Sequence, residues 1–207
     1  MVEGGMIDWA CHANDAAAAL QETTAFGRAV EMAVKFAERH LGETLIVITA
    51  DHETGGLTLG HGQTPYLNDY SLLDRQKLSF QKFSAEVKKR KRSGLSFDET
   101  CKLVETNYGL DYGKLTTAEQ AALKQAWEVS TQKRTLPKAE ADELYGGYEP
   151  IAAAANRIFA AKAGLGWSTY AHTALPVLTA AIGVNSEKFT GRYDNTAIAR
   201  LLREMLQ

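Results

Sequence analysis

The sequence predicts an α/β fold whose central sheet is mixed, mostly parallel, and interrupted by a helical insertion. Residues 15–40 are Ala-rich with helical periodicity, and a short apolar run, Leu45–Ile48, follows them. Residues 63–163 are largely helical in pattern, and strand-like sequence returns after about residue 164. A helix followed by a strand that is apolar on both faces is typical of a parallel α/β sheet.

The first part of the chain supplies a helix and two strands. Leu20, Val30 and Val34 recur near helical spacing, which predicts one long helix or two helices joined near Thr23–Thr24. The run Leu45–Ile48 does not alternate, so we expect a strand covered on both faces. This strand ends in a polar turn, and a brief strand follows at 57–59.

The middle part contains helix-start signals. Ser96 precedes Glu99 by three residues and Thr116 precedes Glu119 by three, the spacing of capping boxes, so helices are expected over 97–108 and 118–130. Pro150 is expected to open another helix. The last part predicts a strand over 176–182 and a helix from about 196 to 206. We therefore expect residues 1–62 and 164–207 to form the α/β core, with 63–163 as a helical insertion within the same domain.

The composition restricts the possible partners. The chain has 207 residues, 45% of them hydrophobic, and a formal net charge of -2, so we expect a globular protein without a nucleic-acid partner. No apolar stretch approaches the roughly 20 residues of a membrane span.

Two cysteines do not make a disulfide framework. The first residues lack the basic and apolar regions of a signal peptide, which we expect to have been removed or to lie outside this sequence.

Acids and histidines gather at the ends of the predicted core elements. Asp8 and His12 are four residues apart, so both lie on one face of a helix. Asp51 and His52 follow the buried strand, at the edge where α/β sheets place ligand sites. His172 opens a core strand and is placed to reach the same crevice. Carboxylate and imidazole together suit a zinc ion.

Each of these features has a plainer interpretation. Asp8 would cap the next helix, and His12 would be a solvated surface residue. Asp51 and His52 would form a strand-end turn in which Asp51 bonds the backbone two residues further on. His172 would be a core histidine with a hydrogen-bond partner.

Three segments resemble motifs of alkaline phosphatases, and they occur in the order found in that family. They are Val-Glu-Gly-Gly-Met-Ile-Asp-Trp-Ala-Cys-His-Ala-Asn-Asp at 2–15, Thr-Ala-Asp-His-Glu-Thr-Gly-Gly-Leu at 49–57, and Gly-Trp-Ser-Thr-Tyr-Ala-His-Thr at 166–173. Tyr-Asp-Asn-Thr at 193–196 follows the third motif. The resemblance covers roughly half of the chain. It implies the three-layer α/β sandwich of that family, in an incomplete form.

The resemblance also implies roles for particular residues. Asp8, His12 and His172 would hold one zinc ion, and Asp51 and His52 a second. Glu3 would belong to a neighbouring magnesium site. The implied reaction is hydrolysis of phosphate monoesters, in which two metal ions about 3.5–4 Å apart clamp the attacking and leaving oxygens.

One family motif is missing from this sequence. The nucleophile in the family is a serine in an Asp-Ser-Ala-like motif that precedes the Glu-Gly-Gly segment, and no serine here follows an aspartate. No catalytic residue is therefore assigned. We expect the C-terminal half of an alkaline phosphatase, arising from a truncated reading frame or made as a fragment, with little or no activity alone.

Further expectations follow from the resemblance and from the incomplete sheet. Family members are generally exported, so the resemblance implies a periplasmic or secreted origin. An uncovered strand edge favours a homodimer or association with another chain.

Two other functions compete with this interpretation. Sulfatases, phosphodiesterases and phosphoglycerate mutases of the same superfamily share metal-binding aspartates and histidines. The amino-acid sequence of residues 49–56 nevertheless favours phosphomonoesters as substrates. A non-catalytic fragment that binds metal or nucleic acid is the second alternative, suggested by the basic run Lys88–Arg92. Five consecutive basic residues in a chain whose net charge is -2 are weak evidence for binding to the phosphate backbone of a nucleic acid.

Overall fold

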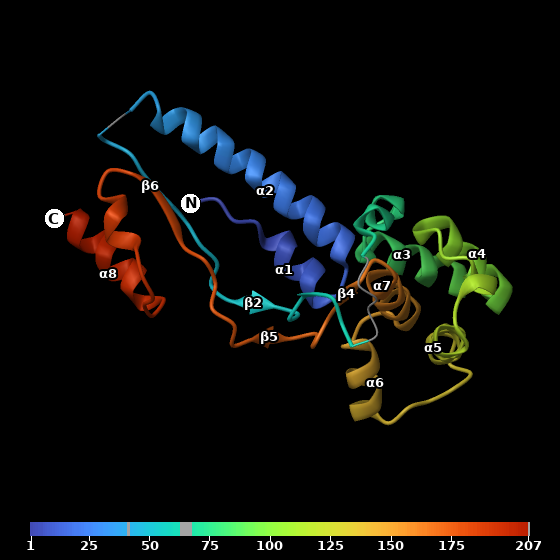
Figure 1. Ribbon diagram of the computed structural model, residues 1–207. Helices are drawn as coiled ribbons and strands as arrows, with labels where there is room; N and C mark the ends of the chain where they lie inside the picture. Colours follow the sequence, from blue (N-terminus) through green and yellow to red (C-terminus); the bar gives the residue numbers. More distant parts are fainter. Residues whose placement is uncertain (41, 63–67, 207) are drawn as a thin grey trace. The chain divides into compact units, whose positions relative to one another are not determined.

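The computed structural model describes residues 1–40, 42–62 and 68–206. Two compact units make up the chain. The smaller unit contains residues 1–3, 24–53 and 173–207, and the larger unit contains residues 4–23 and 54–172. The elements follow one another in the order α1 (Gly5–His12), α2 (Ala16–Ala37), β1 (Leu45–Ile48), β2 (Glu53–Thr54), β3 (Thr58–Leu59), α3 (Phe80–Lys91), α4 (Phe97–Tyr108), α5 (Thr117–Ser130), α6 (Lys138–Tyr145), α7 (Pro150–Lys162), β4 (Leu165–Gly166), β5 (His172–Thr173), β6 (Ala180–Gly183) and α8 (Thr196–Met205) (Figure 1). Short 3₁₀ helices lie at Tyr70–Arg75, Tyr112–Lys114 and Ser186–Phe189.

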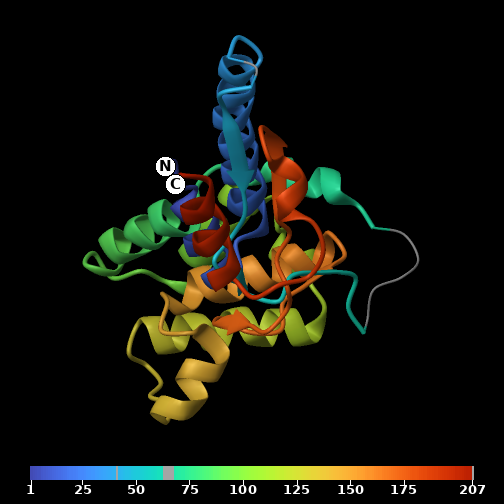
Figure 2. The ribbon, with the colours of Figure 1, turned by 90° about the vertical axis from the view of Figure 1, so that its left-hand side faces the viewer.

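Helix α7 is the central element of the larger unit. It contacts α3, α4, α5 and α6, and it lies beside α5 in both Figure 1 and Figure 2. Its sequence is rich in alanine, and small side chains let neighbouring helices approach closely. Ile151 and Ala155 are completely buried within it. The core around α7 also contains Phe83, Val87, Val104, Tyr108 and Leu123.

Two buried side chains of this core, Tyr108 and Trp127, have hydrogen-bond partners. The Tyr108 hydroxyl donates to Asn156 Oδ1 at 2.7 Å, and Trp127 Nε1 donates to the Leu95 carbonyl at 3.0 Å. A buried polar group without a partner would cost about 1–3 kcal/mol, so these bonds specify one arrangement of the helices.

The helix starts predicted from the sequence are confirmed. Ser96 with Glu99, and Thr116 with Glu119, form complete capping boxes at the starts of α4 and α5. Pro150 opens α7, and the side chain of Glu149 accepts a hydrogen bond from Ala152 N at 2.9 Å. Local sequence therefore decides where these helices begin.

Helix α2 is a single helix. Thr23 Oγ1 donates to the Ala19 carbonyl at 2.7 Å, which accommodates a threonine inside the helix. Asp15 caps the helix by accepting from Ala18 N at 3.0 Å, so the interpretation of Asp8 as its cap is wrong. Asp15 also accepts from Phe80 N at 2.7 Å, which joins α2 to α3. Burial raises the pKa of Asp15, and these hydrogen bonds oppose the shift.

The smaller unit contains a two-stranded sheet. Strand β1 pairs with β6, from Leu45 opposite Gly183 to Ile48 opposite Ala180, and the pair is antiparallel. In the larger unit, β3 and β4 also pair antiparallel. The α/β class is confirmed, and these two antiparallel pairs have the minority direction of the mixed, mostly parallel sheet that we expected. All four residues of β1 are half-buried, so burial does not alternate along the strand, as expected, but the strand is less buried than one covered on both faces.

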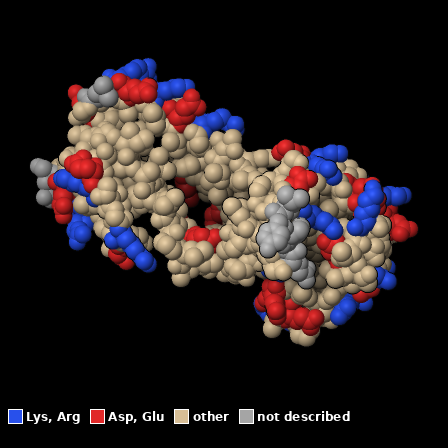
Figure 3. Space-filling view, in the orientation of Figure 1, with Lys and Arg blue, Asp and Glu red and all other residues tan. Residues whose placement is uncertain are grey.

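The surface carries charges of both signs. On the face shown in Figure 3, Lys and Arg side chains alternate with Asp and Glu over each unit, in keeping with the net charge of -2. Among the described residues, no helix combines the length and the apolar character that a bilayer crossing requires.

Candidate metal centre

Helix α1 places two polar side chains one turn apart. Its first turn is closed by a hydrogen bond from Ile7 N to the Gly4 carbonyl at 2.9 Å. Asp8 and His12 project from the same face, and His12 Nε2 lies 3.4 Å from Asp8 Oδ1. The helical spacing predicted from the sequence therefore brings these two side chains together.

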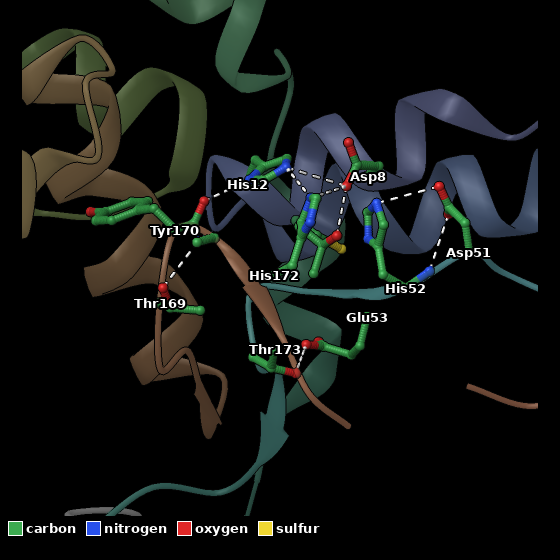
Figure 4. A network of polar contacts seen from close by, with 12 residues as sticks. Asp8, His12, Asp51, His52, Glu53, Thr169, Tyr170, His172 and Thr173 are labelled. Atoms are coloured by element: carbon green, nitrogen blue, oxygen red, sulfur yellow. Dashed lines mark hydrogen bonds and ion pairs between the residues drawn. The ribbon is translucent and has the colours of Figure 1, made fainter. Parts of the chain in front are cut away.

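The third member arrives from a distant part of the chain. His172 is the first residue of β5, 160 residues after His12, and the two Nε2 atoms are 3.1 Å apart. His172 Nε2 lies 3.9 Å from Asp8 Oδ1. The three side chains point toward one another (Figure 4) and all belong to the larger unit. We refer to Asp8, His12 and His172 as the Asp/His/His group.

Neighbouring groups orient two of these side chains. His12 Nδ1 lies 2.6 Å from the Tyr170 carbonyl. A carbonyl only accepts, so Nδ1 carries the hydrogen, and in a neutral ring Nε2 then presents its lone pair to the group. Thr54 Oγ1 donates to Asp8 Oδ1 at 2.6 Å, which fixes that carboxylate. Hydrogen bonds of this kind accompany metal-binding histidines and carboxylates.

The spacing of the three ligand atoms fits a small tetrahedral ion. An ion with bonds of about 2.0–2.1 Å separates its ligand atoms by about 3.3 Å. The observed separations are 3.1, 3.4 and 3.9 Å. Asp8, His12 and His172 are 34%, 25% and 48% exposed, so the group is open to a small molecule.

Asp51 and His52 form a separate pair in the smaller unit. His52 Nε2 lies 3.4 Å from Asp51 Oδ2, and Asp51 Oδ1 accepts from the backbone N of His52 at 3.2 Å. The second contact joins Asp51 to the backbone of the next residue, whereas the plainer interpretation expected a bond to the backbone two residues on, and Oδ2 faces the imidazole. Glu3 is an exposed residue of the same unit.

Three residues around the Asp/His/His group were not assigned from the sequence. They are Thr54, Asn14 and Tyr170, of which Tyr170 acts through its backbone carbonyl. All three lie inside the motifs that resemble alkaline phosphatases, and this was the one available signal. Burial raises the pKa of the Tyr170 hydroxyl to about 12, so it stays protonated near neutral pH.

The basic run has a structural explanation. Lys88–Lys91 form the last turn of α3 and Arg92 follows as its C-terminal cap. Cations at a helix C-terminus interact favourably with the helix dipole. Arg90 also forms an ion pair with Glu86 at 2.7 Å.

Fold and site together define an α/β protein with an Asp/His/His group suited to a metal ion. A family model described as alkaline phosphatase matches residues 1–207. The chain belongs to the alkaline phosphatase family.

Individual relatives agree with this assignment. The chain is 31% identical over 217 aligned positions to alkaline phosphatase 3 of Bacillus subtilis (strain 168), covering 100% of this chain and 39% of that protein. The crystal structure of a cold-active alkaline phosphatase from a psychrophilic Shewanella species superposes with a TM-score of 0.73 at 28% identity, covering 100% of this chain and 44% of that one. The Thermus thermophilus alkaline phosphatase gives a TM-score of 0.72 at 26% identity, covering 97% and 41%. The chain thus spans about two-fifths of the length of these relatives.

Proposed function

We propose that this chain supplies the zinc-binding part of a phosphomonoester hydrolase, and that Asp8, His12 and His172 hold the first zinc ion. The convergence of these three side chains carries the proposal. Two come from one turn of α1, and the third comes from β5, 160 residues away. The hydrogen bond from His12 Nδ1 to the Tyr170 carbonyl supports it, because that bond leaves Nε2 free to act as a ligand.

The residues of the chain would bind and orient, and the metal would add Lewis-acid stabilisation of phosphoryl oxygens. Asp8 would contribute one negative charge toward the cation. Thr54 would keep the Asp8 oxygen on the side of the histidines through its hydroxyl donor. The solvent-exposed edge of His172 would leave space for a phosphate ester.

A second metal site is part of the proposal. Asp51 and His52 would hold the second zinc ion, and Glu3 would serve the magnesium site. The 3.4 Å separation of Asp51 Oδ2 and His52 Nε2 suits two ligands of one tetrahedral ion. The assignment to these particular metals rests on resemblance to the family, as does a periplasmic or secreted location.

We expect the isolated chain to have little or no phosphatase activity. No serine follows an aspartate in this sequence, so the nucleophile motif of the family is not available to it. A phosphomonoesterase assay with an aryl phosphate tests this expectation, and turnover comparable to that of a full-length relative would refute it.

The zinc site is tested by elemental analysis of the purified, monodisperse chain. The His172→Ala variant removes one proposed ligand, and His40→Ala removes a histidine outside the proposed sites. We expect close to one zinc per chain in the wild type and in His40→Ala, and its loss in His172→Ala. Zinc that is absent from the wild type, or retained in His172→Ala, would contradict the proposal.

A further inference from the structure

We propose that Asn14 is a positioning residue for the Asp/His/His group, because its side chain joins the two chain segments that carry the histidines. The inference rests on the proposed zinc site. Asn14 lies two residues after His12 and is completely buried. Its φ of +52° lies in the left-handed region, which Asn adopts more readily than most residues. Backbone and burial together hold the amide in one place.

The amide of Asn14 is bonded on both sides. Its Nδ2 donates to the Cys11 carbonyl at 3.1 Å and to the Thr169 carbonyl at 3.0 Å. Its Oδ1 accepts from Arg157 Nε at 3.1 Å. Carbonyls only accept and a guanidinium only donates, so a single orientation of the amide satisfies all three bonds. Cys11 immediately precedes one histidine and Thr169 lies three residues before the other, so Asn14 links α1 to the segment leading into β5.

Arg157 extends this connection to Tyr170. Its guanidinium carbon lies 4.3 Å from the centre of the Tyr170 ring, in cation–π geometry. The Tyr170 hydroxyl donates to the Leu144 carbonyl at 2.8 Å, which anchors the far end of the ring. The carbonyl of the same residue accepts from His12 Nδ1 at 2.6 Å. Asn14 therefore acts on the ligand nitrogen of His12 through Arg157 and Tyr170.

This network fixes two properties of the proposed site. It holds the Tyr170 carbonyl where it selects the tautomer of His12, and it holds β5 in register with α1 so that the two Nε2 atoms stay close. Loss of such supporting hydrogen bonds weakens metal affinity about 10–100-fold. A purely structural role, such as ending α1, would lower stability but leave the affinity of the folded molecules unchanged.

The test compares two buried asparagines in the whole 207-residue chain. Asn14→Asp keeps the shape of the side chain but turns an oxygen toward two carbonyl oxygens. Asn107→Asp is the control, because Asn107 is also buried and its amide bonds to Leu78 N at 2.7 Å and Leu78 O at 3.2 Å, and Leu78 belongs to neither of the segments that carry the histidines. Both variants are titrated with Zn²⁺, and with Co²⁺ followed by its visible absorption spectrum.

We expect Asn14→Asp to bind both ions at least about tenfold more weakly and to show a changed Co²⁺ spectrum at saturation. Asn107→Asp is expected to unfold at lower temperature but to keep wild-type affinity and spectrum. Should Asn14→Asp fail to fold, Arg157→Lys replaces it, since lysine keeps the charge but lacks the Nε donor and the flat stacking surface.

The outcomes separate this inference from the proposed function. A wild-type chain that binds neither ion overturns the zinc site, and the role of Asn14 with it. A wild type that binds while Asn14→Asp and Arg157→Lys retain its affinity and spectrum overturns the role of Asn14 alone. An equal loss of affinity in Asn107→Asp would reveal general destabilisation and also overturn it.

Discussion

Two adjacent glycines at the end of α6 provide a matched test of how firmly Tyr170 is held. Gly146 and Gly147 have φ values of +59° and +78°, so an alanine at either position is strained. A Cβ on Gly146 would lie 2.7 Å from Cβ and Cδ1 of Tyr170 and closer still to Cγ, whereas a Cβ on Gly147 would meet nothing within 4 Å. The two substitutions therefore share the backbone strain and differ in the collision.

The magnitudes follow from these two contributions. Left-handed backbone costs a non-glycine residue about 1–2 kcal/mol. Forcing a packed ring aside costs about 1–3 kcal/mol more, and Tyr170 cannot move easily because Arg157 and Leu144 hold it. We expect a loss of about 3 kcal/mol for Gly146→Ala and about 1 kcal/mol for Gly147→Ala. For a chain of this size, these correspond to drops in Tm of about 6–12 °C and 2–4 °C.

Thermal unfolding by circular dichroism measures both variants, with and without added Zn²⁺. Gly146→Ala is also expected to reduce the stabilisation that Zn²⁺ provides, because displacement of Tyr170 moves the carbonyl that orients His12. Equal Tm values for the two variants would show that Tyr170 is free to move, and would refute the reasoning.

Three further changes test other parts of the structure. Thr54→Val removes the hydroxyl donor to Asp8, so zinc affinity measured by calorimetric titration should fall about tenfold. Burial raises the pKa of Glu149 above 4.5. Its contribution to stability is therefore present below pH 4.5 and is lost as the pH rises through the pKa of the folded state. Glu149→Gln should remove this contribution and so flatten the pH dependence of Tm. Tyr108→Phe leaves buried Asn156 Oδ1 without its donor and should cost about 1–3 kcal/mol in urea denaturation.

Each of these three substitutions has a control variant or a result that would contradict the prediction. Thr58→Val removes an exposed hydroxyl bond to the Gly60 carbonyl and should leave zinc affinity unchanged; an equal effect at both threonines would contradict the role of Thr54. A Glu149→Gln variant whose Tm follows pH as steeply as the wild type would exclude that carboxyl as the source. Wild-type stability in Tyr108→Phe would mean that another donor replaces the phenol.

The sequence predicted local structure better than it predicted long-range contacts. The capping pairs at Ser96 and Thr116 act within three residues, so the helix starts could be predicted directly. The direction of β1 could not, because an apolar run records coverage of its faces but not the course of its neighbour. Register with β6 depends on a segment about 135 residues later in the chain.

The candidate site shows the same division. The spacing of Asp8 and His12 placed both on one helical face without further information. The approach of His172, 160 positions from His12, was expected from its place at the start of a core strand, and the resemblance to the family then implied that it joins Asp8 and His12. The contribution of Tyr170 escaped sequence reasoning because its backbone carbonyl, which any residue has, makes the contact.

The meeting of α1 with β5 also closes a loop between His12 and His172, which are 160 positions apart in the sequence. The entropy of closing a flexible loop grows only with the logarithm of its length, about 0.6 kcal/mol for each doubling. Exposed loops within this segment can therefore change length at little thermodynamic cost, as long as the buried core around α7 and the residues that support the group are kept. A metal ion bound by the Asp/His/His group would therefore cross-link α1 and β5, while the exposed loops between them could vary in length.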